Sequence, residues 1–337
     1  MSEDGTAQTV RELGEFALID RINAGRAHAR EVLIGPGDDA ALIAAPDGRF
    51  VVTTDMLVEG RHFRFDWSSP VDVGRKAIAQ NAADVVAMGA RPTSFVVALG
   101  CPADTPVSVI EGLADGMWQE AARAGGSIAG GDLVRSSEVV ISVTAFGDLG
   151  GAVEVRRSGA SKGEIVAVAG ELGWSAAGLA LLERGTVRAT TELSRFEAKA
   201  LETHRVPQPV YDAVLALAAN RPRALTDISD GLLADLGHLA RASGVSIDID
   251  RALLADPELD AVATSVNADA PQWILAGGED HAFAGTFDAD APLPPGWRRI
   301  GTVGVGSGVT VDGTTPNMRG GWDSFRGSDE SSTPSPR

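Results

Sequence analysis

The sequence is poor in several residue types that define common classes of protein. It has a single cysteine, Cys101, so an intrachain disulfide is impossible and a cysteine-rich zinc site is excluded. Cys101 follows an apolar, strand-like run, which indicates a small buried side chain. Aromatic residues make up only 5% of the 337 residues, so the core must consist mainly of Ala, Val, Leu and Ile.

Basic residues are also scarce. The chain has 29 Lys and Arg against 46 Asp and Glu, which gives a net charge of −17. Such a surface repels nucleic-acid phosphates, which argues against a nucleic-acid partner. It also repels free ATP, so a nucleotide would have to arrive with metal ions. The lysines are Lys76, Lys162 and Lys199, so a phosphate clamp must use arginine or metal.

Segments that direct a protein to a membrane are missing as well. Residues 1–10 have no basic region and no apolar stretch, and no run of about 18 apolar residues occurs anywhere. We therefore expect a cytoplasmic protein without membrane contact.

The common nucleotide-binding signatures are absent. There is no G-x-x-x-x-G-K-[ST] loop and no protein-kinase H-R-D or D-F-G set. The glycines at 304–308 are not followed by a helical pattern, which favours a hairpin turn over a dinucleotide loop. The five histidines show no metal-binding spacing, and His62 reads as a loop histidine at the exit of a strand.

The length of the chain and its apolar periodicity predict two mixed α/β domains. Strand-like and helical runs alternate without βαβ regularity, so the fold class is α/β of the α+β kind rather than a doubly wound sheet. Helices are expected over 71–88 and 107–124, and a hairpin over 40–54 around Pro46-Asp47-Gly48. The predicted division is a flexible N-terminus 1–11, domains 12–150 and 151–326, and a disordered tail 327–337.

Carboxylates recur at strand ends and in glycine-rich turns. They occupy five places along the chain, at Asp38-Asp39, Asp55, Asp84, Asp132 and Asp227 to Asp230. Each has an ordinary structural explanation, since Asp beside Gly is common turn chemistry and Asp227, Ser229 or Asp230 could be a helix N-cap. Gathered in one cleft, however, they would repel one another, and Mg²⁺ would relieve that repulsion and carry phosphates.

Seven motifs in this order resemble the thiamine-monophosphate kinase family, within the aminoimidazole ribonucleotide synthetase superfamily. They are Gly35-Pro-Gly-Asp-Asp-Ala-Ala, Thr54-Asp-Met-Leu-Val-Glu-Gly-Arg-His-Phe63, Asn81-Ala-Ala-Asp-Val-Val-Ala-Met-Gly-Ala90, Gly130-Gly-Asp132, Arg157-Ser-Gly-Ala160, Asp227-Ile-Ser-Asp-Gly-Leu232 and Gly277-Gly-Glu-Asp280. The resemblance covers residues 12–326. It implies two α/β domains, with the first binding ATP and Mg²⁺, and a homodimer in which the N-terminal sheets pair.

The resemblance also implies roles for individual residues. Metal ligands would be Asp38, Thr53, Thr54, Asp55, Asp84, Asp132, Asp227 and Asp230. ATP contacts would come from Gly131, Asp132, Arg156, Arg157 and Ser229, and thiamine phosphate contacts from His62, Glu279 and Trp322. The groups expected to act in catalysis are Asp55, Asp132, Asp230 and Arg157. The reaction would be direct in-line transfer from ATP to thiamine monophosphate with several Mg²⁺ ions.

Two positions depart from the family pattern. The stretch Ala114-Asp-Gly-Met117 lacks an aromatic residue that would stack on adenine, and His281 follows Gly277-Gly-Glu-Asp280 where the family usually has tyrosine. Two alternatives stay open. One is another ATP-dependent enzyme of the same superfamily, and the other is a non-catalytic nucleotide or metal sensor.

Overall fold

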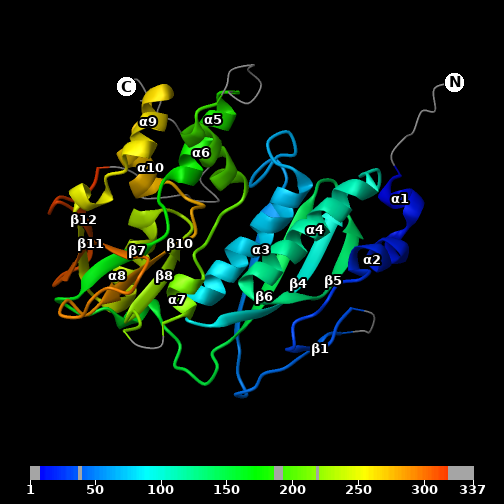
Figure 1. Cartoon of the computed structure of the whole chain (residues 1–337), viewed down its shortest axis with the longest axis horizontal. Helices are drawn as coiled ribbons and strands as arrows, with labels where there is room; N and C mark the ends of the chain where they lie inside the picture. The colour runs from blue at the N-terminus through cyan, green and yellow to red at the C-terminus, as the bar shows by residue number, and fades with distance from the viewer. Residues whose placement is uncertain (1–7, 37–39, 186–192, 218–219, 318–337) are drawn as a thin grey trace, which may run out of the picture.

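Two mixed β-sheets organise the chain, and helices lie against both (Figure 1). The computed structural model describes residues 8–36, 40–185, 193–217 and 220–317. The strands are β1 (Val32–Ile34), β2 (Leu42–Ile43), β3 (Val51–Val58), β4 (Arg91–Cys101), β5 (Ser127–Arg135), β6 (Val140–Asp148), β7 (Ile165–Ala169), β8 (Ala224–Ile228), β9 (Ser246–Ile249), β10 (Ala282–Phe287), β11 (Trp297–Gly304) and β12 (Gly308–Val311).

The helices include two long ones in the first half and several shorter ones in the second. They are α1 (Val10–Leu13), α2 (Glu15–Asn23), α3 (Pro70–Ala87), α4 (Val107–Ala124), α5 (Trp174–Glu183), α6 (Arg195–Arg205), α7 (Asp212–Leu215), α8 (Leu232–Ser243), α9 (Pro257–Ser265) and α10 (Ala270–Ala276). None of the helices in the described ranges is long and apolar enough to span a membrane.

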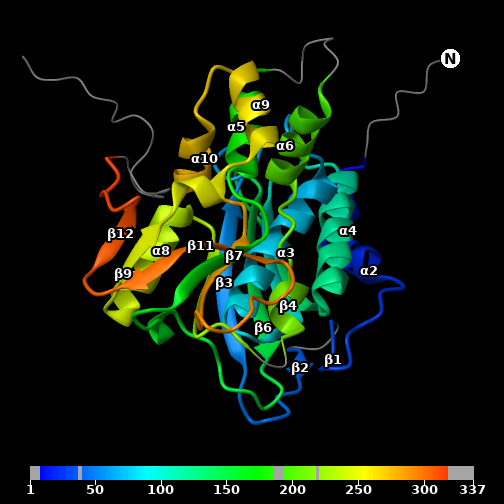
Figure 2. The same ribbon diagram turned by 60° about the vertical axis from the view of Figure 1, so that its left-hand side comes forward.

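The first sheet has the strand order β3-β6-β4-β5 and carries α3 and α4 on one face. Figure 2 shows the two helices running side by side over these strands. Gly74 and Gly116 let them approach closely, because a Cβ on either would lie 2.0 Å from a carbonyl oxygen of the other helix. Helix α3 begins after Ser69, whose side chain caps the helix together with that of Asp72.

The second sheet has the order β12-β9-β11-β7-β10-β8, and its strands β7, β10 and β8 are buried on both faces. The side chains of β7 alternate between two hydrophobic cores. Ile165, Ala167 and Ala169 join the core beneath α3 and α4, whereas Val166 and Val168 join a second core with α5 and α8. A strand covered on both faces reads as a continuous apolar run, as Ile165–Ala169 does. The first core therefore continues across both sheets, and α3 lies at their junction.

The mixed α/β fold and the two long helices agree with the sequence-based prediction, and Cys101 is buried as expected. The predicted hairpin is wrong, because β2 pairs with β1 and β3 pairs with β6. A turn does form, with Gly48 at φ 78°, but its flanking strands join different sheets. The hairpin expected at 304–308 is also wrong, since β11 and β12 lie on opposite sides of β9.

Candidate functional site

The carboxylates of the first half meet where β3 faces α3. Successive side chains of a strand point to opposite faces, and Thr53 and Asp55 point toward the helix. The hydroxyl of Thr53 donates to Oδ2 of Asp84 at 2.9 Å, and the backbone N–H of Asp55 donates to Oδ1 of Asn81 at 3.0 Å. Asn81 and Asp84 lie about one turn apart on α3, so the helix presents both to the strand.

The second half adds Asp227, on β8, to the same place. Its side chain is only 2% exposed, and its Oδ2 lies 3.1 Å from Nδ1 of His281. Although burial opposes it, the hydrogen bond and charge of Asp227 raise the pKa of His281. The helix α3 contacts β8 directly, which brings Asp227 close to Asp55 and Asp84. The three carboxylates come from three elements and from both halves of the chain.

Crowding of these carboxylates changes their acidity. Burial, followed by the charges of Asp227 and Asp55, raises the pKa of Asp84 to about 7. Burial also raises the pKa of Asp55, with Asp227 adding to the effect and His281 opposing it. Like charges and loss of water both disfavour the ionised form. The cluster is therefore electrostatically strained at neutral pH and would be relieved by a cation.

The carboxylate of Asp235 holds the loop that follows β8. One oxygen of this carboxylate accepts the backbone N–H groups of Ser229, Asp230 and Gly231, each at 3.1 Å. Gly231 has φ 121° and is the N-cap of α8, so the interpretation of Asp227, Ser229 or Asp230 as N-cap is wrong. The side chains of Ser229 and Asp230 stay partly exposed. Burial and Asp227 raise the pKa of Asp230.

The two candidate arginines differ in what they contact. Nε of Arg157 donates to the hydroxyl of Thr226 at 3.1 Å, and its charge acts on Asp230. Arg156 instead pairs with Glu154 on the surface. Arg157 is therefore the guanidinium that lies beside the carboxylate cluster, and it is exposed to solvent.

His62 and Glu279, predicted to contact thiamine phosphate, lie on either side of a lysine. Nδ1 of His62 accepts the N–H of Val58 at 3.0 Å, and burial lowers the pKa of His62. Glu279 forms an ion pair with Lys76, 2.9 Å from Oε1 to Nζ. Although burial opposes it, the Lys76 charge lowers the pKa of Glu279. The two residues belong to different halves of the chain and meet here.

Two predicted residues, Thr54 and Asp132, face the opposite side of the first sheet. Thr54 alternates away from Asp55, and its hydroxyl donates to the carbonyl of Val143 at 2.9 Å. Asp132 and Gly131 lie on β5, at the other edge of the sheet from β3. Asp132 and Met56 lie in the same cross-strand row on the exposed face. They are separated by three strand spacings, which is roughly 14 Å. Within one chain, Thr54 and Asp132 thus do not join the Asp55 cluster.

Asp38, Asp39 and Trp322 lie outside the described residues, as does the tail 327–337. Within the described ranges, no group of three or more His, Cys, Asp or Glu side chains is already arranged to hold a metal ion.

Sequence reasoning missed Lys76, Asp235 and His281 as members of this site. Lys76 had a detectable signal, because it falls three residues after Val73 and next to Ala77, on the apolar face of a helix. A lysine on a buried face requires a partner. The contacts of Asp235 and His281 depend on segments far apart in the sequence.

Comparison with known proteins gives the same family for nearly the whole chain. Models described as AIR synthase related protein, N-terminal and C-terminal domains, match residues 37–149 and 161–277. Thiamine-monophosphate kinase of Mycobacterium tuberculosis is 53% identical over 318 residues, covering 94% of this chain and 93% of that protein. The chain belongs to the thiamine-monophosphate kinase family.

Solved structures of the thiamine-monophosphate kinase family share the fold. The Stenotrophomonas maltophilia protein superimposes with a TM-score of 0.77 at 36% identity, covering 89% of this chain and 97% of that one. A structure described as AaThiL complexed with AMPPCP and TMP gives a TM-score of 0.75 at 34% identity, covering 94% and 99%. The Escherichia coli hydrogenase maturation protein HypE is 19% identical and similar in fold alone, with a TM-score of 0.67.

Proposed function

We propose that this chain is an ATP-dependent thiamine-monophosphate kinase, which transfers the γ-phosphoryl group of ATP to thiamine monophosphate and releases thiamine diphosphate and ADP. The observation that carries the proposal is the convergence of Asp55, Asp84 and Asp227 from β3, α3 and β8, in a member of this family. The related protein AaThiL has been crystallised with AMPPCP and TMP, which supports both substrates.

The donor set of the cluster suits Mg²⁺. Hard cations of this kind prefer carboxylate and hydroxyl oxygens, which Thr53, Asp55, Asp84, Asp227 and Asp230 supply. Burial and then the charges of Asp227 and Asp55 raise the pKa of Asp84, and the opposing charge of His281 does not cancel them. When bound, Mg²⁺ would screen the repulsion between two anionic substrates. For Asp38, Thr54 and Asp132, the assignment as metal ligands rests on the family resemblance alone.

The residues of the chain bind and orient rather than transfer protons. A phosphate monoester has a second pKa near 6, so the acceptor is already largely ionised at neutral pH and no general base is required. The exposed guanidinium of Arg157 can hold a phosphate beside the cluster, and Ser229 directly precedes Asp230, on which the charge of Arg157 acts. We assign ATP contacts to these two residues, Gly131, Asp132 and Arg156. Thiamine phosphate contacts are assigned to His62, Glu279 and Trp322.

The direct test is to measure ADP and thiamine diphosphate formed from Mg-ATP with and without thiamine monophosphate. Diphosphate that appears only with both substrates is the expected result. Turnover of ATP with a different phosphorylated acceptor would leave the superfamily assignment and remove the substrate. A folded protein that binds ATP without any turnover would instead favour a nucleotide or metal sensor.

Binding of Mg²⁺ is expected to depend on pH through Asp84. A carboxyl with a pKa of about 7 is mostly protonated at pH 6 and mostly ionised at pH 8, and the metal binds the ionised form. The apparent affinity should therefore rise about tenfold from pH 6 to pH 8 and release a proton near pH 7. Calorimetric Mg²⁺ titrations in two buffers measure both effects. Asp84→Asn should remove most of this pH dependence, and an equal dependence in that variant would contradict the assignment.

We also propose that the chain forms a homodimer through the exposed face of the first sheet. Val52, Met56 and Val134 are each 53% exposed on this face, and Asp132 lies among them. Exposed apolar side chains at both edges of one sheet face favour a protein interface. Met56→Lys is expected to shift the mass in light scattering from dimer toward monomer. Leu253→Lys, at an exposed apolar residue of the second half, should not, and equal masses for both variants would oppose the proposal.

A further inference from the structure

Lys76 is almost completely withdrawn from solvent, yet it lies between the two residues assigned to thiamine phosphate. Its side chain is 3% exposed. Nζ lies 2.9 Å from Oε1 of Glu279 and donates to the backbone carbonyl of His62 at 3.3 Å. One ammonium group thus connects the loop after β3 with the loop before β10. These loops belong to different halves of the chain.

Each partner of Lys76 keeps a part of its side chain free. Glu279 is about one-third exposed. The Nδ1 atom of His62 accepts a backbone N–H, so the neutral ring carries its proton on Nε2. A carboxylate oxygen of Glu279 and the Nε2–H group of His62 therefore remain for a ligand. Lys76 holds both residues through its contacts with Glu279 and with the backbone of His62.

The position of Glu279 needs this support. Its backbone has φ 64°, a left-handed conformation that is costly for a residue with a side chain, and its N–H donates to the carbonyl of Ser229 at 2.8 Å. A second basic group within ion-pair distance is His204, whose Nδ1 lies 3.7 Å from Oε2. Burial lowers the pKa of His204 to about 4, so this imidazole is neutral at pH 7. Among the described residues, Lys76 is thus the charged group in direct contact with Glu279, whereas the charge of His281 acts on Glu279 without an ion pair.

We propose that Lys76 is a positioning residue for thiamine monophosphate. It holds Glu279 and the His62 loop at a fixed separation. This supports binding of thiamine monophosphate and does not affect binding of ATP. The inference rests on the proposed kinase function. Lys76 touches neither substrate, since its ammonium group is enclosed by its protein partners.

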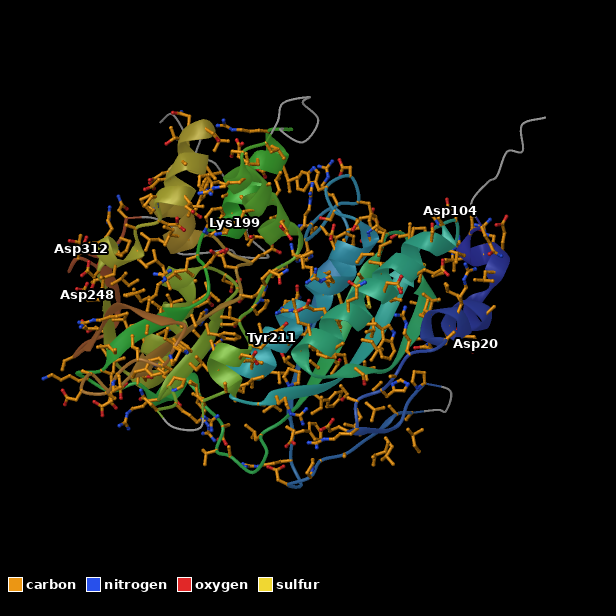
Figure 3. All side chains as sticks on the ribbon, viewed as in Figure 1. Asp20, Asp104, Lys199, Tyr211, Asp248 and Asp312 are labelled. Carbon is orange, nitrogen blue, oxygen red and sulfur yellow. The ribbon has the colours of Figure 1, made fainter. Side chains whose placement is uncertain are left out.

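The test compares Lys76→Met and Lys76→Arg with the matched control Lys199→Met. Lys199, on α6 (Figure 3), is also ion-paired, but its partners are Glu171 and Glu258 rather than residues assigned to thiamine phosphate. Lys76→Met should raise the KM for thiamine monophosphate at least about tenfold and change the KM for ATP by less than about twofold. Lys76→Arg keeps the charge but not the compact geometry, so a smaller rise confined to thiamine monophosphate is expected. Lys199→Met should match the wild type.

Equal rises in both KM values, or a fall in kcat alone, would overturn the proposal. If Lys76→Met does not fold, Lys76→Arg decides by the same comparison of the two KM values. Unchanged kinetics in a folded Lys76→Met variant would show that the ion pair is structural. A wild type that does not phosphorylate thiamine monophosphate would instead refute the proposed function, and the positioning role with it.

Discussion

Replacing Asp55 by asparagine is expected to lower kcat by about a thousandfold or more, because the site loses the negative charge that holds a metal against the phosphates. The fold should survive. The hydrogen bond to Oδ1 of Asn81 uses the backbone N–H of residue 55, so the substitution keeps it. Removing one of three crowded carboxylates should leave the melting temperature of the metal-free protein unchanged or higher.

Steady-state kinetics with both substrates, together with thermal melts, would measure these two effects. A suitable control is Asp20→Asn, which removes the same charge from an exposed position on α2, far from the cluster (Figure 3). The control should keep wild-type activity. Near wild-type turnover by Asp55→Asn would rule out a catalytic metal site built on this strand.

Loss of Glu120 should destabilise the protein by about 3–5 kcal/mol, the range found when one partner of a buried ion pair is removed. Glu120 is completely buried on α4. Its carboxylate accepts hydrogen bonds from Arg75 at 3.3 Å, from Arg123 at 2.7 Å and from the hydroxyl of Tyr211 at 3.0 Å. Tyr211 immediately precedes α7 (Figure 3), so this network ties the second half to the two long helices.

Urea unfolding of Glu120→Ala would test this expectation. The variant leaves two guanidinium groups and a buried hydroxyl without their acceptor. Glu120→Gln retains the shape and one acceptor oxygen, so its loss should be clearly smaller. A change within about 0.5 kcal/mol for Glu120→Ala would mean that the network adds little to stability.

Local features of the fold were predictable from the sequence. The helix expected over 107–124 matches α4, and that over 71–88 differs from α3 by one residue at each end. Both have apolar periodicity, and Gly125 ends α4 in a left-handed conformation. Strand pairing was not predictable in the same way. The turn at Gly48 was evident, but nothing near it indicates that β3 pairs with β6 rather than with β2. The boundaries of the two domains stay a prediction.

The candidate site was predictable in composition and only partly in geometry. Asp55, Asp84 and Asp227 do converge. The family resemblance implies Thr53, Thr54 and Asp55 together as ligands, and the structure directs the hydroxyl of Thr54 away from the face that carries Thr53 and Asp55. The ion pair of Lys76 could not be derived, because its partner Glu279 is about 200 residues away along the chain. The approach of such distant segments is decided by packing of the two sheets around α3.

The placement of β3 at the edge of the first sheet has a consequence for synthesis on the ribosome. In the described sheet β3 lies beside β6, and α3, β4, α4 and β5 are all made between them. The nascent β3, with exposed Val52 and Met56, therefore has no hydrogen-bonding partner within the sheet until β6 has been synthesised. Until β6 is made, β3, the strand that carries Asp55, therefore exposes unpaired backbone groups to which another chain could bind.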